Sequence, residues 1–146
     1  MIDLDTYEVV RLEDIADFGR AKQGHVYPAG TSWIQISATR GQLGYLTHPD
    51  TIHTKNVAII PQGGVEPFYF HISMQAGIDE FMAKYATGLN IKEQEVGKFK
   101  IRLHNIETQK AMIKVYKLWE QERKTTMAEI KKLNDLKSYL LNNMFV

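Results

Sequence analysis

The chain has 146 residues, of which 44% are hydrophobic and 24% charged, and its formal net charge of +1 excludes a strongly basic nucleic-acid-binding protein. It has no cysteine, so disulfides and thiolate metal sites are excluded, and no apolar run reaches the roughly 18 residues that a membrane-spanning helix requires. The acidic start, Met1-Ile2-Asp3-Leu4-Asp5, is unlike a signal peptide, so we expect a cytoplasmic protein with one domain of roughly 100 residues and an additional element.

The first half of the chain predicts short strands separated by polar, glycine-containing loops. The expected elements, in order, are a strand over residues 6–12, a helical turn over 13–16, a polar loop over 19–30, a strand over 32–37, a loop over 38–44, a short extended piece over 45–47 and a turn over 48–50. The continuous apolar run over residues 56–60 predicts a buried strand, which Pro61 ends.

The second half mixes helix and strand patterns. Phe68–Ile72 fits a strand by composition, yet Pro67 suits the first position of a helix, and periodicity does not decide between them. Apolar residues three and four apart predict a helix over residues 77–86. A capping-box pattern, an asparagine with a glutamate three residues later, predicts a short helix within residues 90–97. Residues 98–103 alternate as a last strand, so the globular part is expected to be α+β.

Residues 105–144 predict one long helix, because they contain no Pro or Gly and consist mostly of residues with high helix propensity. Asn105 is the expected N-cap, and at about 1.5 Å per residue the helix would be roughly 60 Å long. Apolar side chains recur at alternating steps of four and three, as in a coiled coil, with Arg123 and Thr126 as a polar interruption. The predicted dimer or partner interface comprises Met112, Tyr116, Trp119, Arg123, Met127, Ile130, Leu133, Leu136, Leu140 and Met144.

Two arrangements would cover the apolar face of this helix. It could fold back on its own domain as an amphipathic helix, or it could pair with a helix of another chain. Globular helices usually have about 8–20 residues, and the expected length exceeds what so small a domain can cover. We therefore expect a coiled-coil-forming helix that pairs with another chain.

The sequence contains no arrangement typical of an active site. His48, Asp50 and His53 lie close together, but their spacing around a Pro turn fits no metal site on a single element, and surface loop histidines are the simpler interpretation. The serines lack a nucleophile-elbow context, and no phosphate-binding glycine loop precedes a helix. We expect no catalytic residues, no metal and no cofactor.

Polar side chains in the loops between the strands are candidates for binding DNA. Arg, Lys and Gln form bidentate bonds to purine edges or charge pairs with phosphate. Composition alone favours a solvated surface, since loops are polar in most proteins. The predicted DNA-binding residues are Arg20, Lys22, Gln23, Arg40, Gln42, Lys55 and Gln62.

Several segments, in a fixed order, favour a DNA-binding function over an ordinary solvated surface. They are Leu12–Ala16 with Gly19, Pro28–Thr31, Asn56–Pro61 with Phe68–Phe70, Phe99–Leu103 with Ile106–Lys110, and Leu133–Phe145. With these segments the chain resembles half of a DNA-specificity subunit of type I restriction-modification systems. The resemblance covers nearly the whole chain.

The resemblance implies that residues 1–103 form a small mixed α/β target-recognition domain, whose loops enter the major groove and read one half of a split site. Residues 104–146 would form a dimerisation and docking helix. This helix would bind the modification subunits, which methylate adenine using S-adenosylmethionine, and indirectly the ATP-driven restriction subunits. The chain itself would be non-catalytic and would bind double-stranded DNA.

Two departures from the family pattern affect this interpretation. His104 stands where the family usually has a Pro before the long helix. Family members also carry two recognition domains and two helices that pair antiparallel, so a chain with one of each is expected to form a homodimer that reads a palindromic, bipartite site. Pairing with a second half-subunit stays open, as do a coiled-coil adaptor that binds only protein and an inhibitory half-subunit that does not read DNA.

Overall fold

The computed structural model describes residues 3–144. Met1 and Ile2 of the acidic start and Phe145 of the closing pattern lie outside the described residues. The chain divides into two compact units, Met1–Ala111 and Met112–Val146. The first unit contains the strands, the shorter helices and the first residues of the long helix. The second unit is the remainder of that helix.

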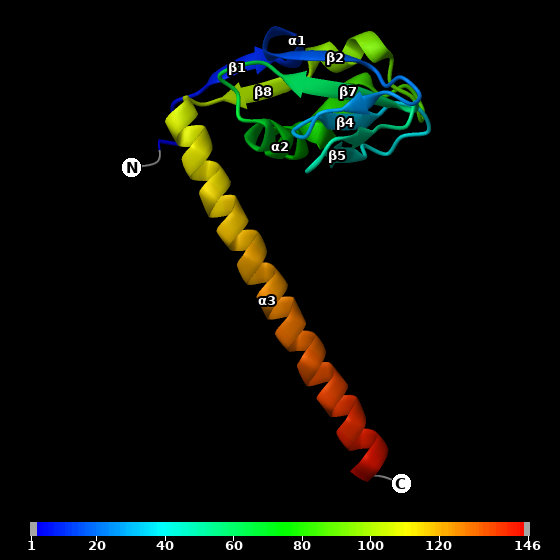
Figure 1. The fold of residues 1–146 in the computed structure, drawn as a ribbon, viewed down its shortest axis with the longest axis vertical. Coiled ribbons are helices and arrows are strands. Elements are labelled where there is room, and N and C mark those ends of the chain that lie inside the picture. Colours follow the sequence, from blue (N-terminus) through cyan, green and yellow to red (C-terminus); the bar gives the residue numbers. More distant parts are fainter. Residues whose placement is uncertain (1–2, 145–146) are drawn as a thin grey trace. The chain divides into compact units, whose positions relative to one another are not determined.

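The first unit is built on an antiparallel four-stranded sheet with the order β2-β7-β4-β5 (Figure 1). These strands are β2 (Ala16–Arg20), β7 (Asn56–Pro61), β4 (Ser32–Gln35) and β5 (Leu43–Tyr45). β7 lies between β2 and β4, and its Val57, Ala58 and Ile59 are buried on both faces, as the continuous apolar run predicted. Two small antiparallel sheets complete the strands, β1 (Glu8–Arg11) with β8 (Lys100–Leu103), and β3 (Val26–Tyr27) with β6 (Asp50–Thr51).

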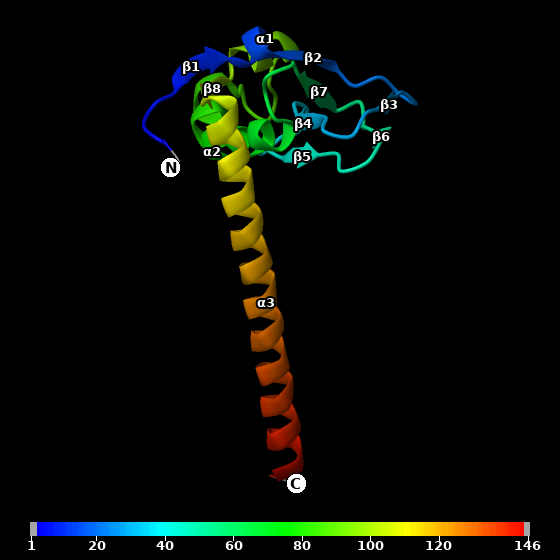
Figure 2. The same ribbon diagram turned by 60° about the vertical axis from the view of Figure 1, so that its left-hand side comes forward.

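Three shorter helices accompany the sheets. They are α1 (Leu12–Ile15), α2 (Pro67–Tyr85) and the 3₁₀ helix η1 (Glu93–Lys98). α2 lies against one face of the main sheet (Figures 1 and 2), and its Phe70, Met74 and Phe81 pack with Ile34 and Ile59 of the sheet. A smaller cluster, Ala21, Tyr27, Ile52 and Ala58 with Trp33 and Leu46, links the main sheet to β3 and β6.

The structure resolves the ambiguous segment after Pro67 as helix, and α2 is longer than the predicted helix over residues 77–86. Pro67 occupies the first turn, as the alternative interpretation required. Gly77 lies inside the helix, where a Cβ would come within 3.1 Å of the ring of Phe99, the residue just before β8. The glycine that suggested a helix start therefore permits close packing between α2 and β8.

Other boundaries were also wrong. Gly19 does not open a loop, since β2 continues to Arg20 through pairing with β7. The predicted loop over residues 19–30 contains β3, and β6 begins at the last residue of the predicted turn over residues 48–50. The extended piece predicted over residues 45–47 lies two residues earlier as β5. Asn90 caps no helix, because its Oδ1 accepts a hydrogen bond from the Ala38 N–H at 3.2 Å. Tertiary partners decided each of these positions.

The long helix α3 (Ile106–Met144) confirms the prediction of one uninterrupted C-terminal helix. Asn105 caps it, because Asn105 Oδ1 accepts the Thr108 N–H at 2.8 Å. Its 39 residues correspond to a length of roughly 58 Å. The α+β domain followed by one long helix is thus the predicted fold class. Among residues 3–144, no helix is both long and apolar enough to span a membrane.

His104, the residue that departs from the family pattern, is buried just before α3. Its Nδ1 lies 2.6 Å from Tyr69 Oη, and its Nε2 lies 3.1 Å from the Leu4 carbonyl oxygen. Gln109, which is 1% exposed, donates from Nε2 to the His104 carbonyl at 2.7 Å and accepts the Glu66 N–H at 2.9 Å. These bonds fix the first turn of α3 to the segments before α2 and after β8.

Candidate nucleic-acid interface

One end of the main sheet gathers most of the polar loops that the sequence singled out. The pairs Arg20 with Val57 and Gln35 with Asn56 place the end of β2, the end of β4 and the start of β7 next to each other. The Ile36 N–H donates to the Lys55 carbonyl at 3.0 Å, which continues the ladder into the loops. The loops before β3, between β4 and β5, and before β7 therefore form one surface, which we call the loop surface.

Arg20 holds this surface together. Its Nε donates to the Thr54 carbonyl at 2.9 Å, and its Nη2 donates to Ser37 Oγ at 3.3 Å. Its own N–H donates to Glu93 Oε1 at 3.0 Å, which adds η1 to the surface. The guanidinium therefore joins two loops, and its role in the structure is first of all to position them.

The turn between β4 and β5 presents Arg40. Gln42 Oε1 accepts the Arg40 N–H at 2.7 Å and lies 3.2 Å from Thr39 Oγ1, so the Gln42 carbonyl group is used inside the turn. Gly41 has a φ of 88° and lies against α2, where a Cβ would approach Ile78 and Met82 to 3.2 and 3.3 Å. A rigid turn thus displays an exposed arginine, with the Gln42 amide nitrogen as a further donor.

Four predicted side chains on the loop surface are free to contact a ligand. Lys22, Gln23, Arg40 and Lys55 are exposed, and their side chains form no hydrogen bond or ion pair with any of residues 3–144. Three of them are cationic, and the nearby Glu93 carboxylate is engaged by the Arg20 N–H. The loop surface therefore offers unpaired positive charge and one amide, a combination suited to phosphates and base edges.

Gln62 lies apart from the other predicted residues. It follows β7, whereas Lys55 precedes it, and the six residues of β7 separate the two by about 20 Å. The Gln62 N–H donates to the Ile15 carbonyl at 2.9 Å, so this position belongs to the opposite end of the sheet. The structure brings six of the seven predicted residues to one end and leaves Gln62 at the other.

Three polar residues on the loop surface were missed by the sequence predictions. Ser37 Oγ accepts a hydrogen bond from the Arg20 guanidinium, and His53 Nδ1 accepts one from the Lys55 N–H at 3.1 Å. His25 packs edge-on against Tyr27, with ring centroids 4.6 Å apart. Each lies at or beyond the end of a strand. Their positions would have pointed to the surface only if the strand order had been known.

The histidine-rich turn brings His48 close to Asp50 but does not bring its histidines and Asp50 together. His48 Nε2 lies 3.7 Å from Asp50 Oδ2, while His53 bonds the backbone of Lys55. Within the described residues, no three His, Cys, Asp or Glu side chains are grouped so that they could bind a metal ion.

The second candidate surface is the apolar side of α3. In the second unit Trp119, Met127, Ile130, Leu133, Leu136, Leu140 and Met144 expose between 43% and 68% of their surface, while Met112 and Tyr116 are half-buried. Arg123, in the polar interruption, lies 5.8 Å from the Trp119 ring and pairs with Glu120 at 3.4 Å. An exposed apolar stripe of this length is typical of a surface that binds another protein.

Comparison with known proteins shows that this fold is the fold of specificity subunits of type I restriction-modification systems. One similar structure is a chain of a type I R-M system described for its complex assembly and conformational transition, with 15% identity and a TM-score of 0.74 over 94% of this chain and 44% of that one. The HsdS subunit from Thermoanaerobacter tengcongensis has 17% identity and a TM-score of 0.68 over 98% and 46% of the two chains.

The type I S subunit from M. genitalium has 17% identity and a TM-score of 0.64 over 97% and 46%. No family model and no curated protein matches the sequence. This chain spans just under half the length of these structures, so nearly all of it corresponds to one half of such a subunit.

Proposed function

We propose that this chain is a half-length DNA-specificity subunit of a type I restriction-modification complex, acting in the cytoplasm without catalytic residues of its own. The observation that carries the proposal is that its fold corresponds, over nearly its whole length, to about half of such subunits. Residues 1–103 would be the target-recognition domain, and residues 104–146 the dimerisation and docking helix.

The loop surface would read the DNA. Arg40 and Gln23 are the candidates for base contacts, because an arginine bonds the O6 and N7 of guanine and a glutamine bonds the N6 and N7 of adenine. Lys22 and Lys55 carry unpaired ammonium groups suited to phosphates. Arg20 and Gln42 would shape the loops around these contacts, as their bonds within the domain indicate.

The apolar side of α3 would pair with the same side of a second copy. In a parallel, in-register dimer Arg123 would face its own counterpart, and so would Lys137, which places like charges opposite each other in the seam. In an antiparallel dimer centred near Ala128, Lys137 faces Trp119 and Arg123 faces Leu133. The antiparallel arrangement removes both repulsions and adds a cation–π contact, so we favour it.

In this dimer the outer surface of the paired helices would bind the modification subunits, and the restriction subunits would join the complex indirectly. Two identical recognition domains related by a two-fold axis require a palindromic, bipartite DNA site. The spacer between the half-sites would be set by the length of α3.

The proposal is tested by copurification and by DNA selection. Expressed together with modification subunits of a type I methyltransferase, the chain should copurify with them, and the complex should select from random DNA a palindrome interrupted by a spacer. Inserting seven residues into α3 keeps the seam continuous and should lengthen the spacer without changing the half-sites. Selection of an asymmetric or uninterrupted site would contradict the homodimer, and absence of any selected sequence would contradict DNA reading.

A further inference from the structure

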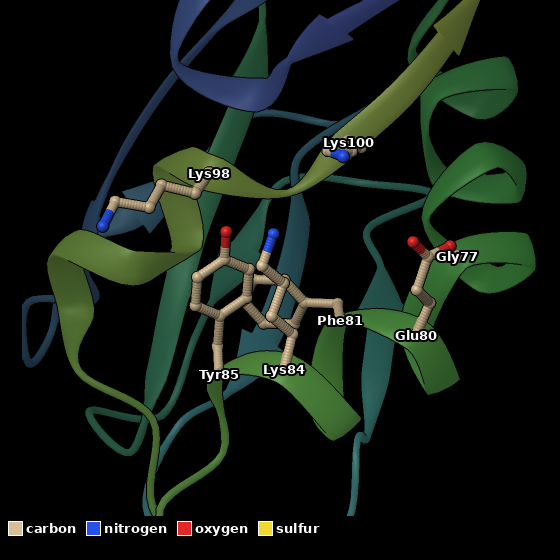
Figure 3. Close-up of a pocket in the computed structure, with 7 residues that line it drawn as sticks. All are labelled: Gly77, Glu80, Phe81, Lys84, Tyr85, Lys98 and Lys100. Atoms are coloured by element: carbon tan, nitrogen blue, oxygen red, sulfur yellow. The ribbon is translucent and has the colours of Figure 1, made fainter.

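A shallow pocket on α2, η1 and β8 lies outside the loop surface (Figure 3). Its lining includes Lys84 and Lys98, whose ammonium groups lie near the ring of Tyr85, and Lys100. Its volume is about 40 Å³, whereas sites for drug-sized ligands or cofactors have about 300–1,000 Å³. A nucleobase or a cofactor is therefore too large, while one small group such as a phosphate fits.

The floor of the pocket is rigid. The Phe81 and Phe99 rings are stacked with centroids 4.6 Å apart, and Phe81 lies 5.0 Å from the Tyr85 ring. Gly77 allows β8 to approach α2 closely enough for Phe99 to enter this stack. The lysines therefore extend from elements whose backbones are fixed by buried aromatic packing, which lowers the cost of ordering them around a ligand.

The charges around the pocket favour an anion. The ammonium groups of Lys84 and Lys98 lie 5.4 and 5.9 Å from the centre of the Tyr85 ring. Lys98 pairs with Glu95 at 3.0 Å, whereas Lys84 and Lys100 form no ion pair with any of residues 3–144. Glu80 is the single acid in the lining, and Figure 3 shows it one turn along α2 from Lys84. The lining therefore keeps a net positive charge.

The pocket is joined to the loop surface by the segment between α2 and η1. The Thr39 N–H donates to the Leu89 carbonyl at 2.7 Å, and the Ile91 N–H donates to the Ile36 carbonyl at 2.9 Å. Arg20 bonds Glu93 in η1, only five residues before Lys98. A ligand held by the pocket would therefore be fixed relative to the loops that carry Arg40 and Lys55.

We propose that this pocket binds one phosphodiester group of the DNA backbone through the ammonium groups of Lys84 and Lys100, whose charges no acid of residues 3–144 pairs, whereas the charge of Lys98 is offset by Glu95. The proposal rests on the proposed function, since it assigns a second contact to the same DNA. The loop surface would read bases, and the pocket would fix the register of the domain on the duplex without reading sequence.

The test is a DNA-binding titration of the full-length chain, assembled with its modification subunits, at several salt concentrations. The Lys84→Gln/Lys100→Gln double variant should bind cognate and random duplexes about fivefold more weakly at about 0.15 M salt, and its salt slope should fall by about one, the value for one lost phosphate contact. Sequence preference should stay unchanged. Lys84→Arg/Lys100→Arg keeps the charges and should restore the slope.

The matched control is Lys131→Gln/Lys132→Gln on α3, which removes the same charge from the second unit, and gel filtration checks that this variant still assembles with the modification subunits. If the control lowers the salt slope as much as the pocket variant, net charge explains the effect and the proposal is wrong. If the unmodified complex selects its site but the pocket variant has an unchanged salt slope, the pocket proposal is wrong and the proposed function stands. If the unmodified complex selects no DNA sequence, the proposed function fails as well.

Discussion

The exposed leucines of α3 offer the sharpest test of the homodimer. In the Leu133→Lys/Leu140→Lys variant, two apolar side chains of the seam are replaced by cations in each chain. Both leucines lie on one side of the helix, because seven residues correspond to two turns. The variant should therefore weaken self-association without disturbing the recognition domain, whose buried core lies in the first unit.

The size of the effect follows from the exposed surface. Fully burying a leucine contributes about 1.5–3 kcal/mol, and Leu133 and Leu140 expose 66% and 43% of their surface. With about half of that contribution available at each of four leucines, the dimer loses about 3–6 kcal/mol. At 1.4 kcal/mol per decade, the dissociation constant should rise by about two to four orders of magnitude.

Sedimentation equilibrium over a range of concentrations measures this change. The matched control is Ser138→Lys/Asn142→Lys, which adds the same charge on the side of the helix opposite to the two leucines. The control should remain dimeric where the leucine variant is monomeric, and circular dichroism should show both variants folded. A leucine variant that dimerises as tightly as the unmodified chain would place the interface elsewhere, and equal dissociation of both variants would mean that charge alone decides.

Three further predictions concern the first unit. Arg40→Ala or Gln23→Ala should relax base preference by roughly 1–3 kcal/mol per lost bidentate contact. Lys22→Ala or Lys55→Ala should instead weaken binding to all sequences alike. A DNA-binding titration that shows no change for any of the four variants would exclude the loop surface as the DNA-binding face. Gln109→Leu leaves the part-buried Glu66 N–H and the buried His104 carbonyl without their Gln109 partners, so urea denaturation should show that the free energy of unfolding falls by about 2–4 kcal/mol. The exposed Gln94→Leu should change it negligibly. Burial lowers the pKa of His71 below 6.5, so the unfolded chain binds the proton more readily and the free energy of unfolding should fall as pH drops below 6.5; a His71→Gln variant with the same pH dependence would contradict this.

The features predicted well are those set by local sequence. α3 has a continuous propensity signal and a cap, and Asn105 makes the expected bond to the Thr108 N–H. β7 and β8 could likewise be predicted without knowing their partners. A continuous apolar run indicates a strand buried on both faces, as in β7, and alternation indicates a strand buried on one face, as in β8. Their boundaries agree with the predictions to within two residues.

The features predicted poorly depend on distant partners. Gly77 interrupts the helical pattern of α2 only because Phe99, far along the chain, needs the space of a side chain. Asn90 has the sequence context of a cap, but its Oδ1 bonds the Ala38 N–H instead. In the same way, the seven candidate DNA-binding residues were chosen by type, and only the strand order shows that Gln62 lies at the other end of the sheet.

The symmetry of the DNA site would report the stoichiometry of the complex. Every base-reading side chain proposed here belongs to a single domain, so a two-fold dimer presents the same donors and acceptors to each half-site and can select only a palindrome. A complex that pairs this chain with a different half-subunit would present two different loop surfaces and would select two unrelated half-sites. Because α3 would set the spacing in both cases, the spacer does not distinguish them, whereas the half-site sequences do.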